Sequence, residues 1–262
     1  CVVHVCGDSG LRAGTPIDNF RVLTTIYLAD TTVPAVAVDG QPMFFSFEHG
    51  ATLAALRRLK RPGSGTVVQV GTALAYRSIP LQAPYCGAKA AVRGFTDAIR
   101  CELAHERSAI HMTMVQLSAF NTPQFEWART TIGKRPRPMG KIFQPEIAAQ
   151  AIYWAATHRR REVWVGAPAV QAILATRAFP GLLDRFLGRT AVDGQHTGEP
   201  LPAERPDNLH APVPGDHGAH GRFDAQARAF SAQWWFNSRR NELALSAFLA
   251  GLLMHVWRRR RR

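Results

Sequence analysis

Tyr85 and Lys89 are the residues of this 262-residue chain whose types and spacing most directly suggest chemistry. Residues four positions apart on a helix project from the same face, one turn above the other. A free phenol loses its proton near pH ~10, and an adjacent ammonium group favours the phenolate. The pair therefore predicts a group that exchanges a proton with a bound oxygen atom. The alternative is a solvated surface pair, because helices carry this spacing by chance.

The segments around the pair predict how it is positioned. Residues 65–71 have the β-branched composition of a buried strand, which ends at the hydroxyl of Thr72. A helix is predicted over residues 84–106, with a proline near its start, and a second strand over residues 110–117. In sheets of parallel strands, ligands bind where the strands end, and Thr72 stands at such an end.

Two more elements complete the expected fold. Residues 145–158 predict another helix, because their apolar residues recur at helical spacing, and residues 162–166 predict a last strand. The succession of strand, helix, strand, helix and strand predicts the α/β class. We expect a doubly wound parallel sheet of the Rossmann-like type, incomplete at its amino terminus, with an extended C-terminal tail.

With these features in place, the chain resembles the short-chain dehydrogenase/reductase family over roughly residues 15–190. The resemblance is strongest over residues 65–123, which combine a strand, a hydroxyl residue, a Tyr-x-x-x-Lys helix, a second strand and a loop ending in Thr122. It implies an NAD(P)-dependent oxidoreductase that transfers hydride between a nicotinamide and a carbonyl or secondary alcohol. The small-molecule partner would be that carbonyl compound or alcohol.

The resemblance also implies roles for individual residues. Tyr85 would be the acid/base, and Lys89 would hold the nicotinamide ribose and lower the pKa of the tyrosine. Thr72 stands where the family has its serine, and its hydroxyl would polarise the substrate carbonyl. Thr122 matches the threonine that contacts the nicotinamide end of the cofactor, although Leu117 and Ser118 replace the family's Pro-Gly. The expected cofactor is NAD or NADP, with NADP slightly preferred, and no metal is expected.

The amino-terminal part departs from the family pattern. A dinucleotide fold needs a Gly-rich turn after its first strand, so that backbone N–H groups contact the pyrophosphate. Three glycines follow residues 2–6, but their Gly-x-x-Gly-x-x-x-Gly spacing does not fit. We therefore interpret residues 1–7 as the family's fourth strand, and the chain as a truncated member without the Gly-rich part. Ile26 falls near the position of a further catalytic Asn. The alternative function is a noncatalytic fragment or pseudoenzyme that acts as a binding partner.

Composition changes suggest the domain organisation. Residues 1–188 are expected to form the incomplete Rossmann-like domain, in which residues 29–47 interrupt a helical region with Pro and Gly and are interpreted as an insertion, either an inserted loop or a retained non-coding segment. Residues 189–241, rich in Pro, Gly and His, are expected to be extended on the domain or disordered. Residues 242–262 predict an apolar helix with an Arg-rich terminus. Residues 125–143, basic with two aromatics, predict a substrate lid or a solvated loop.

The cysteines and histidines suggest no metal site and no disulfide framework. The four cysteines lack paired metal-ligand spacing, which favours a reducing, cytoplasmic setting, and the two on the tyrosine helix, Cys86 and Cys101, are expected to be buried. Loop residues could in principle gather around a metal, but nothing fixes their geometry. These residues are His210, His217, His220 and Asp216.

The charge of the chain is unbalanced, with 32 basic and 19 acidic side chains and a net charge of +13. Residues 243–257 are apolar, too short for the ~20 residues that span a bilayer, and are followed by the arginines 258–262. They predict contact with a membrane surface, or a helix packed on the domain or a partner. No specific nucleic-acid binding is expected. The resemblance implies a homo-oligomer formed through the tyrosine helix, whose Val92, Phe95, Ile99 and Leu103 we assign mostly to the core.

Overall fold

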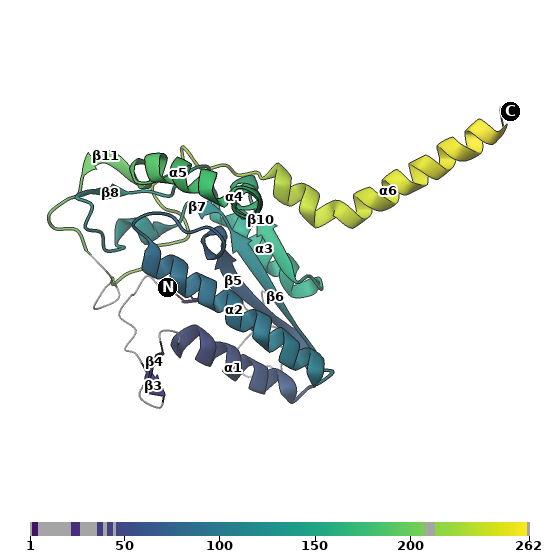
Figure 1. The fold of residues 1–262 in the computed structure, drawn as a ribbon, viewed down its shortest axis with the longest axis horizontal. Coiled ribbons are helices and arrows are strands. Elements are labelled where there is room, and N and C mark those ends of the chain that lie inside the picture. Colours follow the sequence, from purple (N-terminus) through teal and green to yellow (C-terminus); the bar gives the residue numbers. More distant parts are fainter. Residues whose placement is uncertain are drawn as a thin grey trace.

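The computed structural model describes residues 2–4, 22–26, 36–38, 41–43, 46–206, 208 and 213–260. A five-stranded sheet with the order β1-β2-β5-β6-β10 forms its centre (Figure 1). The strands are β1 (Val2–His4), β2 (Val22–Ile26), β5 (Ser64–Thr72), β6 (Ala109–Leu117) and β10 (Glu162–Val165). From β2 to β10 neighbouring strands run parallel, and β1 pairs with β2 antiparallel.

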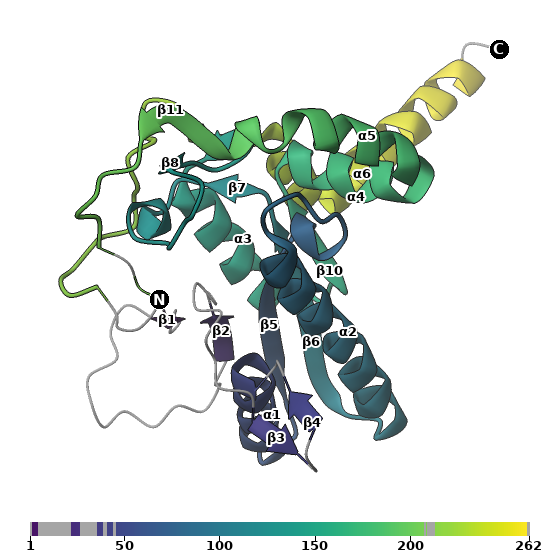
Figure 2. The same ribbon diagram turned by 60° about the vertical axis from the view of Figure 1, so that its left-hand side comes forward.

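Helices cover both faces of this sheet, as Figure 2 shows. The helices α1 (Ser46–Lys60) and α2 (Ala83–His105) lie on one face, and α3 (Pro145–Thr157) lies on the other. Because side chains alternate along a strand, Val67 packs with α1 and α2 while Val68 packs with α3. The predicted α/β class and doubly wound sheet are confirmed.

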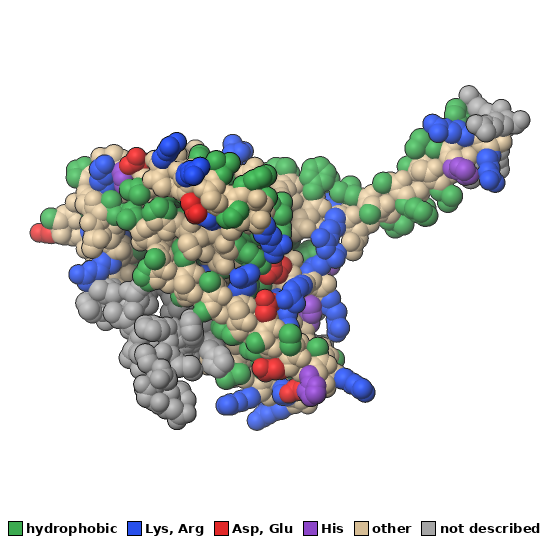
Figure 3. All heavy atoms as spheres, viewed as in Figure 1, with side chains coloured by type: hydrophobic (Ala, Val, Ile, Leu, Met, Phe, Trp, Pro, Cys, Tyr) green, Lys and Arg blue, Asp and Glu red, His purple; other side chains and the backbone are tan. Residues whose placement is uncertain are grey.

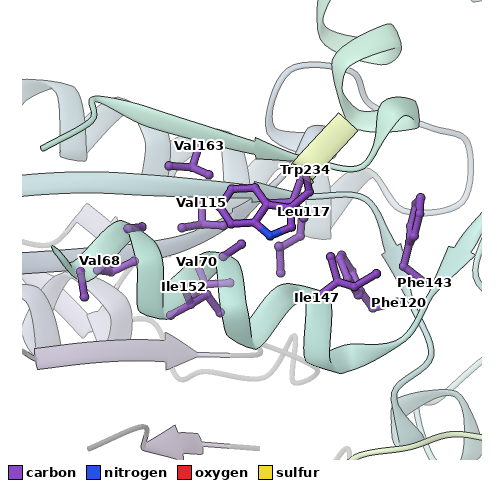
Figure 4. Packing of buried hydrophobic residues seen from close by; sticks show 14 residues of the cluster. Val68, Val70, Val115, Leu117, Phe120, Phe143, Ile147, Ile152, Val163 and Trp234 are labelled. Carbon is purple, nitrogen blue, oxygen red and sulfur yellow. The ribbon is translucent and has the colours of Figure 1, made fainter. Parts of the chain in front are cut away.

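The larger core cluster lies between the sheet and α3 (Figure 4). Strand residues such as Val115 and Val163 pack with Ile147 and Ile152 of α3 in this cluster. Trp234, which comes much later in the sequence, also belongs to it. A second cluster on the opposite face joins Leu56 and Leu59 of α1 to Ile99 and Leu103 of α2, over Val67, Ile110 and Met112 of the sheet. Val92 is buried as well, and Phe95 is half-buried, which confirms the core assignment of this helix face.

The amino-terminal strand was assigned wrongly from the sequence. The strand that lies beside β5 is β2, in register Val22 with Val67, and not residues 1–7, of which β1 forms the antiparallel edge. Within the interval 29–47 a short hairpin pairs β3 (Val36–Val38) with β4 (Gln41–Met43). Helix α1 begins at Ser46. The glycines at 7, 10 and 14 and residues 15–20 lie outside the described residues.

Shorter elements surround the carboxyl edge of the sheet. They are η1 (Ala73–Ala75), β7 (Ala119–Phe120), η2 (Pro123–Glu126), β8 (Lys134–Pro136), β9 (Ile142–Phe143), α4 (Ala167–Ala178), α5 (Pro180–Thr190), η3 (Asp193–Gln195) and β11 (His196–Pro200). Strand β11 pairs antiparallel with β8, and β7 pairs parallel with β9. The segment after residue 189 is therefore partly docked on the domain.

The last helix, α6 (Ala232–Arg260), begins ten residues before the predicted boundary at 242. Its start is fixed by Ser231, whose hydroxyl accepts the N–H of Trp234 at 3.3 Å, in the manner of an N-cap. Among residues 46–206, 208 and 213–260, no helix is both long and apolar enough to cross a bilayer. Cys86 is buried as expected, but Cys101 is exposed, because it lies opposite Ile99 and Leu103 on α2.

Candidate functional site

Thr72 lies at the carboxyl end of β5 and is 8% exposed. The register of the sheet places it beside Leu117 of β6, which in turn lies beside Val165 of β10, so three parallel strands end together. The Thr72 hydroxyl accepts the N–H of Leu74 at 3.3 Å and caps η1. Since the oxygen is the acceptor in this contact, its own O–H group can donate to a bound oxygen atom.

Tyr85 and Lys89 lie in the first turns of α2, which packs against η1 directly after Thr72. Pro84 stands in the first turn of this helix, where a missing N–H leaves no helical hydrogen bond unmade. Lys89 is only 4% exposed and shares the inward face with Cys86, while Tyr85 is half-buried. A lysine is seldom buried so fully without a partner or a ligand.

The loop before α2 is fixed by a residue that sequence reasoning missed. Gln195 donates to the carbonyl oxygens of Pro80 and Ala191, both at 2.9 Å, and accepts from Gln82 at 2.6 Å. Leu81, between two of these partners, has a positive φ of 68°. Such a conformation is strained for a side chain like leucine and persists only where neighbours fix the backbone. Gln195 thus positions the start of the tyrosine helix.

The loop after β6 carries buried hydroxyl groups that have no partner within the part of the chain that the structure describes. Thr122 occupies the N-cap position of η2, and its buried Oγ1 has no hydrogen-bond partner among the described residues. The buried Oγ of Ser118 likewise has no hydrogen-bond partner among the described residues. An unpaired buried hydroxyl costs on the order of 1–3 kcal/mol, so both atoms are suited to hydrogen bonds from a ligand.

Gln116 is a further residue that the sequence reasoning missed. It is fully buried in β6 beside Gly71, and neither its amide oxygen nor its amide nitrogen has a partner within the described part of the chain. A Cβ at Gly71 would overlap the Gln116 amide oxygen, so glycine leaves the space that this side chain fills. The available signal was a polar residue inside an otherwise apolar strand end.

A second tyrosine near the strand end has a different environment. Tyr76 donates its hydroxyl to Glu162 at 2.5 Å, and the guanidinium group of Arg93 lies 4.3 Å from its ring centre. Burial, together with the hydrogen bond to Glu162, raises the pKa of Tyr76 to about 12. This phenol therefore stays protonated at neutral pH.

Residues 125–143, predicted to be a substrate lid or a solvated loop, contact residues from the C-terminal part of the chain, which we name the strap (residues 201–206, 208 and 213–231). Arg205 donates to the carbonyl oxygens of Phe125 at 2.8 Å and Ala128 at 2.7 Å. Trp127 contacts His217 in a tilted arrangement with ring centres 4.3 Å apart, and Phe125 meets Phe223 edge to face. These contacts give residues 125–128 a defined position.

Asn121, next to Thr122, joins the strap to the sheet. It is fully buried, donates to Asp224 at 2.8 Å, and accepts the N–H of Phe223 at 3.0 Å. His220 then bridges Asp224 at 2.9 Å and Glu146 at 2.6 Å. Hydrogen bonding to Asp224, then to Glu146, raises the pKa of His220, and the pKa of Asp224 is lowered mainly by its bond to His220.

The histidines considered as metal ligands have separate partners. His217 contacts the Val213 carbonyl at 3.2 Å, His220 contacts the two carboxylates, and Asp216 accepts the N–H of Gly218. His210 lies outside the described residues. Among the described residues, no three His, Cys, Asp or Glu side chains gather where they could hold a metal ion.

Comparisons with known proteins agree with this arrangement. A family model described as short chain dehydrogenase matches residues 45–132, which include β5, the Tyr85–Lys89 helix start, β6 and Thr122. The chain is 28% identical over 246 residues to the uncharacterized oxidoreductase YxnA of Bacillus subtilis, covering 92% of this chain and 67% of that protein.

Solved structures show partial likeness. A short chain dehydrogenase from Burkholderia cenocepacia in complex with NADP shares 25% identity at a TM-score of 0.44, over 53% of this chain and 54% of that one. A short-chain dehydrogenase from Streptomyces avermitilis shares 18% identity at a TM-score of 0.37, over 54% and 57%. The chain thus spans about two thirds of YxnA and little more than half of each structure. Over residues 45–132 it is similar to the short-chain dehydrogenase family.

Proposed function

We propose that the chain is an NAD(P)-dependent oxidoreductase that transfers hydride between a nicotinamide and a carbonyl or secondary alcohol. The proposal rests on the arrangement at the carboxyl edge of the sheet. Thr72 ends β5 at this edge, and α2, which carries Tyr85 and the buried Lys89, packs beside it. A hydroxyl donor, a phenol and an ammonium group are the set needed to orient a substrate oxygen and move its proton.

The residues at this edge fit the nicotinamide half of a dinucleotide. When bound, the nicotinamide supplies or accepts the hydride. The unpaired hydroxyls of Thr122 and Ser118 are available for its polar groups, and Lys89 would hold the ribose. The described residues include no Gly-rich turn for the pyrophosphate, which is the feature that favours the noncatalytic alternative. Between the two cofactors we favour NADP, because a net charge of +13 favours the ligand with the additional phosphate.

Each of the protein's own side chains has a separate role in the proposed reaction. Thr72 donates its O–H to the substrate oxygen and orients it, and Tyr85 gives up or takes the proton as that oxygen changes charge. The Lys89 ammonium group stabilises the phenolate form of Tyr85. Tyr76 is unsuited to this role, because its pKa is raised to about 12 and its hydroxyl is held by Glu162.

Replacing the phenol tests the assignment. We expect Tyr85→Phe to lower turnover of a ketone or secondary alcohol by about 10²–10⁴-fold, since general acid catalysis is lost while the ring remains. Tyr76→Phe is the matched control, because it also removes one hydroxyl from a partly buried ring, and it should retain most of the activity. Turnover is followed by NADPH absorbance, with circular dichroism to verify folding. Near-wild-type turnover by Tyr85→Phe would remove this residue from the mechanism.

Cofactor binding is tested separately by calorimetric titration of the chain with NADPH and with NADH. Saturable binding that is weakened in Lys89→Met, a variant that keeps the apolar stem of the side chain, would support the site. A folded chain that binds neither nucleotide would instead favour the noncatalytic alternative.

A further inference from the structure

Helix α6 has two halves with different surroundings. In its first turns, Gln233 donates to the Trp164 carbonyl at 2.9 Å and accepts the N–H of Gly166 at 2.8 Å, and Trp234 is buried in the core. Asn241, which accepts from Arg160 at 3.0 Å, is the last residue of this docked half. From Leu243 onward, every side chain that the structure describes is exposed, and the helix runs away from the domain (Figures 1 and 3).

This second half carries exposed large apolar side chains, which form a continuous stripe along one face. Leu245, Phe248, Leu249 and Leu252 follow the i, i+3, i+4, i+7 pattern that places residues on one side of a helix. They are 59%, 69%, 48% and 50% exposed. The other sides of the helix also carry exposed apolar side chains, Leu243, Met254 and Trp257, which are 38%, 57% and 53% exposed. An apolar stripe of this length on a helix that extends into solvent indicates a surface that something covers.

The charges around the stripe are nearly all positive. Arg239 and Arg240 precede it, and five consecutive arginines, 258–262, follow it in the sequence. Glu242 is the only acidic residue from position 232 to the end. Whatever covers the stripe must therefore combine an apolar phase with negative charge at both ends of a segment about 22 Å long.

These requirements select one occupant. A second copy of α6 would place arginines against arginines, whether the two helices ran parallel or antiparallel, so like charges would oppose the pairing. A nucleic acid would satisfy the arginines but not the apolar stripe. An anionic bilayer supplies both, since hydrocarbon lies directly beneath its charged headgroups.

We propose that residues 243–260 of α6 bind the surface of an anionic lipid bilayer, lying along the interface. The stripe faces the acyl chains, and the arginines at both ends extend to the headgroups, as long cationic side chains do. The helix does not cross the bilayer, because 15 apolar residues fall short of the ~20 required. The docked first half of α6 then holds the domain at the membrane surface.

Vesicle co-sedimentation tests this with the full chain. We expect binding to vesicles of phosphatidylcholine mixed with phosphatidylglycerol, weaker binding to phosphatidylcholine alone, and loss of the difference in high salt. Phe248→Asp should lower the partition coefficient by about tenfold or more, because a large apolar side chain no longer enters the lipid. Replacing Arg258 and Arg259 by Ser should lower it by about fivefold for each charge removed.

Leu182→Asp is the matched control, because Leu182 is 67% exposed on α5 and lies outside the stripe. It should leave vesicle binding unchanged, and all variants should keep the wild-type melting temperature. An equal loss of binding in Leu182→Asp would overturn the assignment to α6, as would a chain that binds no anionic vesicles. Self-association without lipid that Phe248→Asp abolishes would assign the stripe to a second copy.

Discussion

Helices α2 and α6 carry comparable apolar stripes but have opposite surroundings. On α2, Val92, Thr96, Ile99 and Leu103 are buried against β5, β6 and α1. On the second half of α6, Leu245, Phe248, Leu249 and Leu252 contact none of the described core. Periodicity therefore predicts that a helix face needs a partner, while only the tertiary structure shows whether the partner is the chain itself.

The largest effect is expected at the docked end of α6. Trp234 is 7% exposed and meets Trp154 of α3 edge to face, with ring centres 5.6 Å apart. Trp234→Ala should lower the free energy of unfolding by about 3–5 kcal/mol, because it leaves a large cavity in the core. Urea denaturation measures the change. A loss below about 1 kcal/mol would mean that the first half of α6 is not part of the folded core.

The stripe of α2 should be nearly as sensitive. Ile99→Ala removes a buried side chain between α2, α1 and the sheet, and should cost about 2–5 kcal/mol of unfolding free energy. Leu174→Ala, at an exposed position on α4, is the control and should cost little. Similar midpoints for both variants in urea would show that α2 is not packed as described.

A smaller effect, dependent on pH, is expected where the strap meets α3. The raised pKa of His220 stabilises the fold below about pH 6.5, and this contribution is lost as the pH rises through the folded value. The lowered pKa values of Glu146 and Asp224 stabilise it above about pH 4, and that contribution is lost as the pH falls.

His220→Gln should therefore reduce stability most between about pH 4.5 and 6.5 and least in alkaline solution. Urea midpoints of both proteins, measured across this pH range, test the expectation. A constant difference at every pH would show that the charge of His220 does not hold the strap.

The smallest effect is expected on the free stripe. Leu249→Ala, the same type of truncation as at Ile99, should change the unfolding free energy by no more than ~0.5 kcal/mol in lipid-free solution, because Leu249 is 48% exposed. Thermal denaturation in lipid-free buffer measures it. A cost comparable to that of Ile99→Ala would reveal a protein partner for the stripe and end the contrast between the two helices.

The central elements could be predicted from the sequence to within one or two residues. Strand β5, helix α2 and strand β6 follow local signals, which are β-branched runs, a proline in the first turn and apolar periodicity. The error at residues 1–7 has a different cause. Residues 1–7 and residues 22–26 are both apolar segments that could pair with β5. Local sequence does not decide between them, because strand pairing is not local, and in the structure Val22–Ile26 pairs with β5.

The candidate site likewise contains residues that local sequence patterns predict and residues that they cannot predict. Thr72, Tyr85, Lys89 and Thr122 were proposed from a motif, and their roles remain predictions. Gln195 could not be found in this way, because its partners Pro80 and Gln82 lie more than a hundred residues earlier and no pattern links them. The start of α6 at Ser231 had a local signal, a hydroxyl residue before an aromatic run, that the Pro- and Gly-rich surroundings obscured.

The contact between Asn121 and the strap has a consequence for how the protein is made. Asn121 is paired with Phe223 and Asp224, which follow it by 102 and 103 positions. Once β10 has left the ribosome, every strand of the five-stranded sheet is outside, yet the loop with Thr122 still lacks the residues that secure it. Closing so distant a contact is slow compared with forming helices. During synthesis the sheet can therefore form first, and the loop with Thr122 is secured only after residues 223 and 224 have emerged.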